Sequence, residues 1–237
     1  MNPKYLEDPY LKEFKTKIVE VDNDAKAFVA SDTIFYPLSG GQLNDLGVVV
    51  VDEKEIKVID VRKKNGKIWH FVEKIDAIKP NKEILMKIDW ERRYRMMRMH
   101  TAAHLISSLI YKKTGAKITG NQLGLDKSRI DFNLENFDRE LIFSIEPEAN
   151  ELIEKSIDVK SYFLPRDEAF KIPELVKLKD ILPPNIPELR IVEIVGVDIQ
   201  ACGGTHVKNL KEIGRIKILK AENKGKNNRR LYYTIEP

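Results

Sequence analysis

The sequence of 237 residues is long enough for one large domain or two ordinary ones, and we expect two. Its single cysteine excludes an intramolecular disulfide and favours a thiolate ligand or a reactive thiol. A net charge of +4 is too small to indicate a polyanionic partner by itself. The charged start of the chain and the lack of a long apolar run predict a soluble, cytoplasmic protein with no signal peptide and no membrane contact.

Short segments rich in β-branched residues dominate the first ninety residues or so. We expect strands at residues 15–22, 26–37, 46–53, 54–62 and 67–74. Turn sequences separate them, and Asn65-Gly66 predicts a hairpin turn. Strands this short and numerous favour a small barrel or a strongly twisted sheet.

The pattern changes at Trp90, where residues 90–115 predict one helix. Its apolar residues recur every three or four positions, as one buried helical face requires: Met99, Ala103, Ile106 and Ile110. We therefore expect a β-rich domain at residues 1–88, which carries the Gly-rich motif, and a second domain at residues 89–237.

The second domain is expected to be α+β, which makes the whole chain α+β. A further helix is predicted at residues 146–157, and residues 172–188 predict an ordered, Pro-rich loop with a short helix. Strands are expected at residues 116–124, 128–134, 159–164, 188–200, 213–222 and 229–237.

Two pairs of side chains with equal spacing indicate a metal site. His100 and His104 lie one turn apart on the predicted helix, so their rings share a face. Cys202 and His206 repeat the spacing in CGGTH, a bend made flexible by two glycines. An isolated HxxxH is more often a core or surface pair, but the second pair favours a metal. Three imidazoles and one thiolate suit tetrahedral zinc better than iron or copper, and His70 is expected to be structural.

Three motifs occur in order: TIFYPLSGGQLNDLG, then HTAAH, then CGGTH followed by IGRIKILKAE and RRLYYTIEP. Together they resemble the editing region of alanyl-tRNA synthetase and its free-standing relatives, the AlaX trans-editing proteins, in their medium-length form. The resemblance implies an aminoacyl-tRNA deacylase, a carboxylic ester hydrolase that removes serine and glycine from tRNA(Ala) with Zn²⁺. The family's ligand positions fall on His100, His104, Cys202 and His206.

The implied chemistry has a physical basis. A small pocket for alanine cannot exclude glycine and rejects serine weakly, so a second, hydrolytic site is the remedy. Zinc could activate a water, hold the amino group of the substrate, or be structural; four protein ligands usually mark a closed site. These alternatives stay open at this point.

The resemblance also implies roles for residues outside the metal site. Gln42 joins Cys202 and His206 as catalytic, and backbone amides at Gly40 and Gly41 approach the ligand. Without the resemblance, SGG is a turn and Gln42 is solvated. The amino-acid pocket is expected to include Thr119, Asn121 and Gln122. Arg129 and Asp131 either brace that pocket or form a surface pair on a strand.

The partner implied is tRNA, held through its phosphates. Local clustering of charge beside aromatics selects Arg92, Arg93, Lys224, Lys226, Arg229 and Arg230. Two alternatives remain: an editing module like that of threonyl-tRNA synthetase, and a zinc-stabilised tRNA-binding protein without catalysis. A metalloprotease is poorly supported, because HTAAH lacks the glutamate that serves as general base.

Overall fold

The computed structural model describes residues 2–135, 138–176, 186–225 and 228–237. The chain forms two compact units, Met1–Met96 and Met97–Pro237. The division lies inside the long helix α2 (Trp90–Thr114), whereas the sequence analysis put it near residue 88, where the helix begins. None of the described helices is long and apolar enough to cross a membrane.

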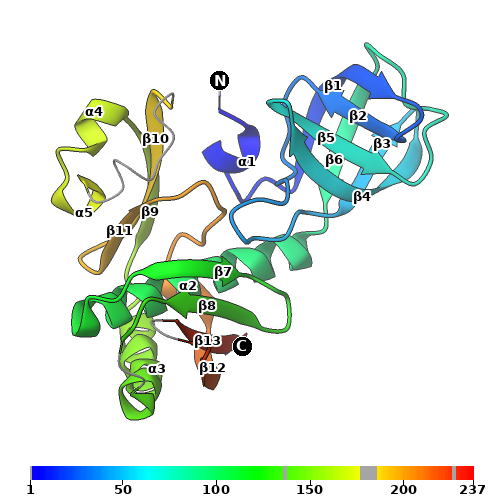
Figure 1. The fold of residues 1–237 in the computed structure, drawn as a ribbon. Coiled ribbons are helices and arrows are strands. Elements are labelled where there is room, and N and C mark those ends of the chain that lie inside the picture. Colours follow the sequence, from blue (N-terminus) through cyan, green and yellow to red (C-terminus); the bar gives the residue numbers. More distant parts are fainter. Residues whose placement is uncertain (1, 136–137, 177–185, 226–227) are drawn as a thin grey trace. The chain divides into compact units, whose positions relative to one another are not determined.

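The first unit is a closed barrel with the strand order β1-β2-β5-β4-β3-β6, preceded by the short helix α1 (Lys4–Glu7) (Figure 1). This confirms the predicted small barrel. Its strands are β1 (Glu13–Asp22), β2 (Ala27–Ala30), β3 (Gly47–Val51), β4 (Lys54–Lys64), β5 (Lys67–Val72) and β6 (Glu83–Ile88). The turn between β4 and β5 is the predicted one, with φ of 52° at Asn65 and 75° at Gly66.

Two details of the barrel differ from the prediction. Strand β2 ends at Ala30 instead of Pro37, because the Thr33 hydroxyl accepts a hydrogen bond from the Phe35 amide at 3.0 Å and turns the chain out of the ladder. Strand β6 was not predicted, yet it pairs with both β1 and β3 and closes the barrel. Its alternate residues Ile84 and Met86 are buried in the barrel core.

The second unit is built around the later part of α2, in which every residue from 99 to 110 is buried. A four-stranded sheet, β12-β13-β8-β7, packs on this helix, and the Tyr233 hydroxyl donates to the backbone oxygen of Met99 at 2.7 Å. Its strands are β7 (Ile118–Gln122), β8 (Ser128–Phe132), β12 (Arg215–Asn223) and β13 (Arg229–Glu236). The mixture of helices and strands confirms the α+β class.

A three-stranded sheet, β11-β10-β9, also belongs to the second unit (Figure 1). It consists of β9 (Val159–Pro165), β10 (Glu188–Ile194) and β11 (Asp198–Ala201). One strand was expected at residues 188–200, but Gly196 with φ of 71° makes a turn that divides it. The remaining elements are α3 (Arg139–Glu154), α4 (Arg166–Ala169), α5 (Pro173–Val176) and the 3₁₀ helix η1 (Leu210–Ile213).

Helix α3 begins seven residues before the expected start at residue 146. The Asp138 side chain accepts a hydrogen bond from the Leu141 amide and caps the helix. The prediction placed Pro147 in the first turn, but the helix runs through it. Part of the Pro-rich connector, residues 177–185, lies outside the described residues.

Candidate metal centre

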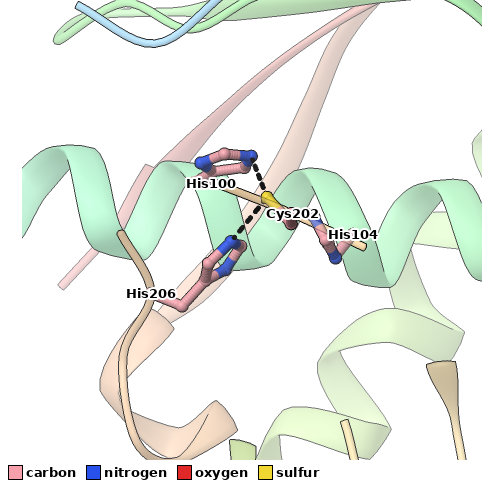
Figure 2. A group of neighbouring side chains, drawn as sticks. All are labelled: His100, His104, Cys202 and His206. Atoms are coloured by element: carbon pink, nitrogen blue, oxygen red, sulfur yellow. Dashed lines mark hydrogen bonds between the residues drawn. The ribbon is translucent and has the colours of Figure 1, made fainter. Parts of the chain in front are cut away.

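Four side chains of the second unit meet at one point: His100, His104, Cys202 and His206. Their ligand atoms all lie within 4.8 Å of one another. Figure 2 shows the sulfur of Cys202 between the rings of His100 and His206. The structure therefore brings together the residues that the two sequence pairs predicted.

Helix α2 sets the positions of two ligands. His100 and His104 are one turn apart and both only 6% exposed, with ring centroids 5.2 Å from each other. The ring of His206 lies 4.3 Å from that of His100 and 4.6 Å from that of His104. Because α2 is buried on all sides here, the helix cannot turn these rings away from the cluster.

The loop after β11 supplies the other two ligands, and a buried arginine holds it. Arg190 of β10, 6% exposed, donates from Nη1 to the backbone oxygens of Cys202 at 3.0 Å and Gly204 at 2.8 Å. The Gly204 amide in turn donates to the Cys202 Sγ at 3.4 Å. Sequence analysis did not identify Arg190; its only sign was a single cation between the apolar residues Leu189 and Ile191 of the strand.

The side chains of the cluster shift one another's ionisation. Burial raises the pKa of the Cys202 thiol, but the neighbouring imidazoles, His100 first, outweigh it and hold that pKa well below its ordinary value. Burial and then the charge of His100 lower the pKa of His206. Burial lowers the pKa of His104, yet the charge of Cys202 and the neighbouring Asp198 carboxylate raise it above its ordinary value. The cluster therefore favours the thiolate of Cys202, the form that binds metals.

Two of the distances within the cluster match those around a tetrahedral cation. Ligand bonds of about 2.0 to 2.3 Å around zinc place neighbouring ligand atoms about 3.4 to 3.6 Å apart. The Cys202 Sγ lies 3.6 Å from Nε2 of His100 and 3.3 Å from Nε2 of His206. The group could thus hold a metal ion, and its three nitrogens and one sulfur are compatible with zinc.

The Gly-rich motif forms a tight turn in the first unit. Gly40 and Gly41 have φ of 56° and 82°, and the backbones of Ser39 and Gln42 bond to each other across the turn. Both glycines are exposed, so their amides are accessible. The Gln42 side chain is fully buried, which corrects the alternative in which it is solvated. Its catalytic role stays a prediction.

The three pocket candidates on β7 do not share one face. Asn121 lies opposite the buried Ile130, whereas Gln122 lies opposite Arg129 and accepts from its Nε at 3.2 Å. Thr119 is at the bulge of the strand. Asn121 and Gln122 point to opposite sides of the strand, because they are adjacent in it. The assignment of the three residues to the amino-acid pocket stays a prediction.

Arg129 and Asp131 form an ion pair, but Asp131 is only 7% exposed, so the pair does not lie on the surface, and a role in the pocket stays a prediction. Asp131 accepts from Arg129 at 2.6 Å and from Arg230 at 2.7 and 3.0 Å. The two bonds from Arg230 join β13 to β8, whereas the bond from Arg129 lies within β8.

For two of the cations, the expected contact with tRNA is corrected by the structure. Arg93 is completely buried and pairs with Asp45, so it cannot contact phosphate. Arg229 is only 7% exposed and donates to Asn223 and Gly225 within the turn between β12 and β13. Charge clustering could not distinguish them from exposed cations.

The other assigned cations remain candidates. Lys224 is exposed, and Arg92 and Arg230 are partly exposed. Lys226 lies outside the described residues.

A barrel joined to an α+β unit with this cluster defines a module related to tRNA synthetases. Residues 189–232 match the threonyl and alanyl tRNA synthetase second additional domain, and residues 6–92 match the class II (A) tRNA synthetases. The chain is 47% identical over 98% of its length to "Alanyl-tRNA editing protein AlaX-M" of Saccharolobus solfataricus, and covers 98% of that protein. The chain belongs to the AlaX-M family.

Two further relatives are consistent with this family. An AlaX-M protein of Methanosarcina barkeri is 48% identical over 98% of the chain, which covers 97% of that relative. An alanine–tRNA ligase of Methanococcus aeolicus is 38% identical over 97% of the chain, which covers 25% of the ligase. The same fold thus occurs as a separate protein and as part of a synthetase.

Proposed function

We propose that this protein is a trans-editing hydrolase that deacylates mischarged tRNA(Ala), removing serine and glycine with the help of zinc. The observation that carries the proposal is the convergence of His100, His104, Cys202 and His206 in a chain whose relatives are named alanyl-tRNA editing proteins. Membership of this family makes the chain an aminoacyl-tRNA deacylase with tRNA as its partner. We expect it to act in the cytoplasm.

The residues of the site have distinct tasks in this proposal. Zinc, when bound, would supply positive charge that polarises an ester or orients a water. The imidazoles of His100 and His104 are held rigidly by α2 and exclude bulk water, and the Cys202 thiolate offsets one unit of cationic charge. His206 completes the donor set.

The other predicted substrate contacts are proposed residue by residue. The accessible amides of Gly40 and Gly41, with Gln42 behind them, are proposed to hold the acceptor end of the tRNA. Asn121 is proposed to face the amino acid. Lys224, Arg92 and Arg230 are proposed to contact phosphates.

Metal content and deacylation, measured on one purified sample, test the proposal. We expect about one zinc per chain and release of serine and glycine from mischarged tRNA(Ala). Cys202→Ala should lose the metal and reduce turnover by at least about 100-fold, because one ligand of the closed set is removed. Ser144→Ala, an exposed position on α3, is the control and should retain both properties.

Other outcomes would identify the alternatives. Cleavage of seryl-tRNA(Thr) with tRNA(Ala) left intact would indicate a threonyl-type module. Binding of tRNA that survives Cys202→Ala, without ester cleavage by the native protein, would indicate a non-catalytic RNA-binding protein.

A further inference from the structure

Two of the candidate ligands are contacted from behind by polar side chains. The Thr101 hydroxyl lies 3.1 Å from Nδ1 of His206, and the Asp198 carboxylate lies 3.4 Å from Nδ1 of His104. We propose that Thr101 and Asp198 are positioning residues, which keep the proton on Nδ1 of these rings and so present Nε2 to the metal. The inference rests on the metal site of the proposed function and names residues beyond its ligands.

The hydrogen bonds of Thr101 determine its role. Its hydroxyl donates to the backbone oxygen of Met97 at 3.0 Å, one turn earlier in α2. A hydroxyl has a single proton, so toward other neighbours this oxygen can only accept. It accepts from the Val207 amide at 3.3 Å, and therefore it also accepts from His206. Nδ1 of His206 is then protonated, and Nε2, which faces Cys202 at 3.3 Å, is a free electron-pair donor.

Thr101 also fixes the loop that carries the ligands. It is fully buried and lies between the two ligand histidines of α2 in the sequence. Because it bonds to the ring of His206 and to the amide of Val207, it holds the side chain and the backbone of the loop at once. The same turn of α2 thus carries the candidate ligand His100 and also Thr101, which supports the candidate ligand His206.

Asp198 supports His104 from strand β11. The side chains of His104 and Asp198 are 7% and 11% exposed. Nδ1 of His104 has no hydrogen-bond partner among the described residues, and the Asp198 carboxylate contacts it as an ion-pair neighbour. The same carboxylate oxygen accepts from Nε2 of Gln200 at 2.9 Å, which fixes its direction. A carboxylate behind a metal-binding imidazole orients the ring and makes its other nitrogen a stronger donor.

The charges agree with this role. A divalent cation bound by one thiolate and three neutral imidazoles would keep one unit of positive charge. Asp198 supplies a negative charge beside it within a largely buried site, which also holds the Arg190 guanidinium. The carboxylate therefore reduces the positive charge of the cluster without being a ligand.

Zinc affinity, measured by competition with a chromophoric chelator, tests the inference without tRNA. We expect Thr101→Val and Asp198→Ala to weaken zinc binding about 10- to 100-fold, while Thr101→Ser, which retains the hydroxyl, stays within about 3-fold of the native protein. Asp198→Asn should fall between, since its amide oxygen still accepts but carries no charge. Circular dichroism of the metal-free variants reports whether each one folds.

A spectroscopic measurement on the unaltered protein decides the case if a variant fails to fold. Nitrogen-resolved NMR of the zinc-bound protein should show Nδ1 protonated and Nε2 metal-bound in His104 and His206. Coordination through Nδ1 in either ring, or native zinc affinity in folded Thr101→Val and Asp198→Ala, would overturn the inference. Zinc binding that behaves as expected in a protein without deacylase activity would support the inference and contradict the proposed function.

Discussion

His70 is the histidine that the metal cluster does not use, and its surroundings explain why. It is fully buried in the barrel, stacked on Phe28 with ring centroids 4.8 Å apart and meeting Phe35 edge-on. Its Nδ1 donates to the backbone oxygen of Phe28, so Nε2 accepts from the Thr33 hydroxyl at 2.8 Å. Both nitrogens are occupied within the barrel, as expected for a structural residue.

This burial makes the stability of the barrel depend on pH. Burial lowers the pKa of His70 to about 4, while an unfolded histidine titrates near 6.5. The neutral ring is favoured in the fold, so its contribution is complete above about pH 6.5 and is lost as the pH falls toward 4, by up to about 3 kcal/mol. We expect the unfolding free energy in urea to fall more steeply over this range than in His70→Phe. If the unfolding free energies of the two proteins changed equally with pH, the expectation would be contradicted.

Sequence patterns predicted the four clustered side chains well, because an i, i+4 spacing is local geometry. Arg190 and Thr101 escaped detection since their partners lie 12 or more positions away, as in the 105 residues between Thr101 and His206. Arg93 was assigned wrongly because a charge cluster does not reveal which cation is buried. Its partner, Asp45, belongs to a distant loop of the barrel.

Strand β6 shows how a short element can be overlooked. The sequence EILMKI precedes the helix directly, and only three of its six residues are buried. Its position in the barrel depends on two partner strands, β1 and β3, which a local pattern cannot reveal. The start of α3 was missed for a similar reason. Its N-cap residue, Asp138, precedes a segment whose sequence gives no clear sign of a helix.

Close packing of β3 on β6 makes Gly47 a sensitive position. A Cβ atom there would lie 2.1 Å from the backbone oxygen of Lys87 in β6. We expect Gly47→Ala to cost about 3 kcal/mol or more, because backbone cannot move aside as a flexible side chain can. Gly66→Ala is the matched control: its Cβ would meet nothing within 4 Å, and its φ of +75° alone should cost about 1 kcal/mol. Equal denaturation midpoints for the two variants would refute this account.

Different interactions stabilise each of the two units. The barrel depends on a closed strand order and an apolar core. The second unit adds the cluster, in which Cys202 and His100 are 102 residues apart in the chain. A metal bound there would join α2 to the loop after β11 and restrict the unfolded chain strongly.

Chelation should therefore affect the units unequally. We expect removal of the metal to increase hydrogen exchange in α2 beyond Met97 and in β10 and β11, while the barrel strands keep their protection. Exchange measured by mass spectrometry with and without chelator, with zinc added back as the control, gives the comparison. Uniform loss of protection throughout the barrel would contradict it.

The bond from the Gly204 amide to the Cys202 sulfur has a consequence for reactivity. An amide that donates to a thiolate withdraws electron density from the sulfur, which then transfers less charge to any ion it binds. A metal ion held there would remain a stronger Lewis acid than the same donor set would otherwise leave it. A single backbone amide of the CGGTH loop would thus tune how strongly such an ion attracts an oxygen or nitrogen.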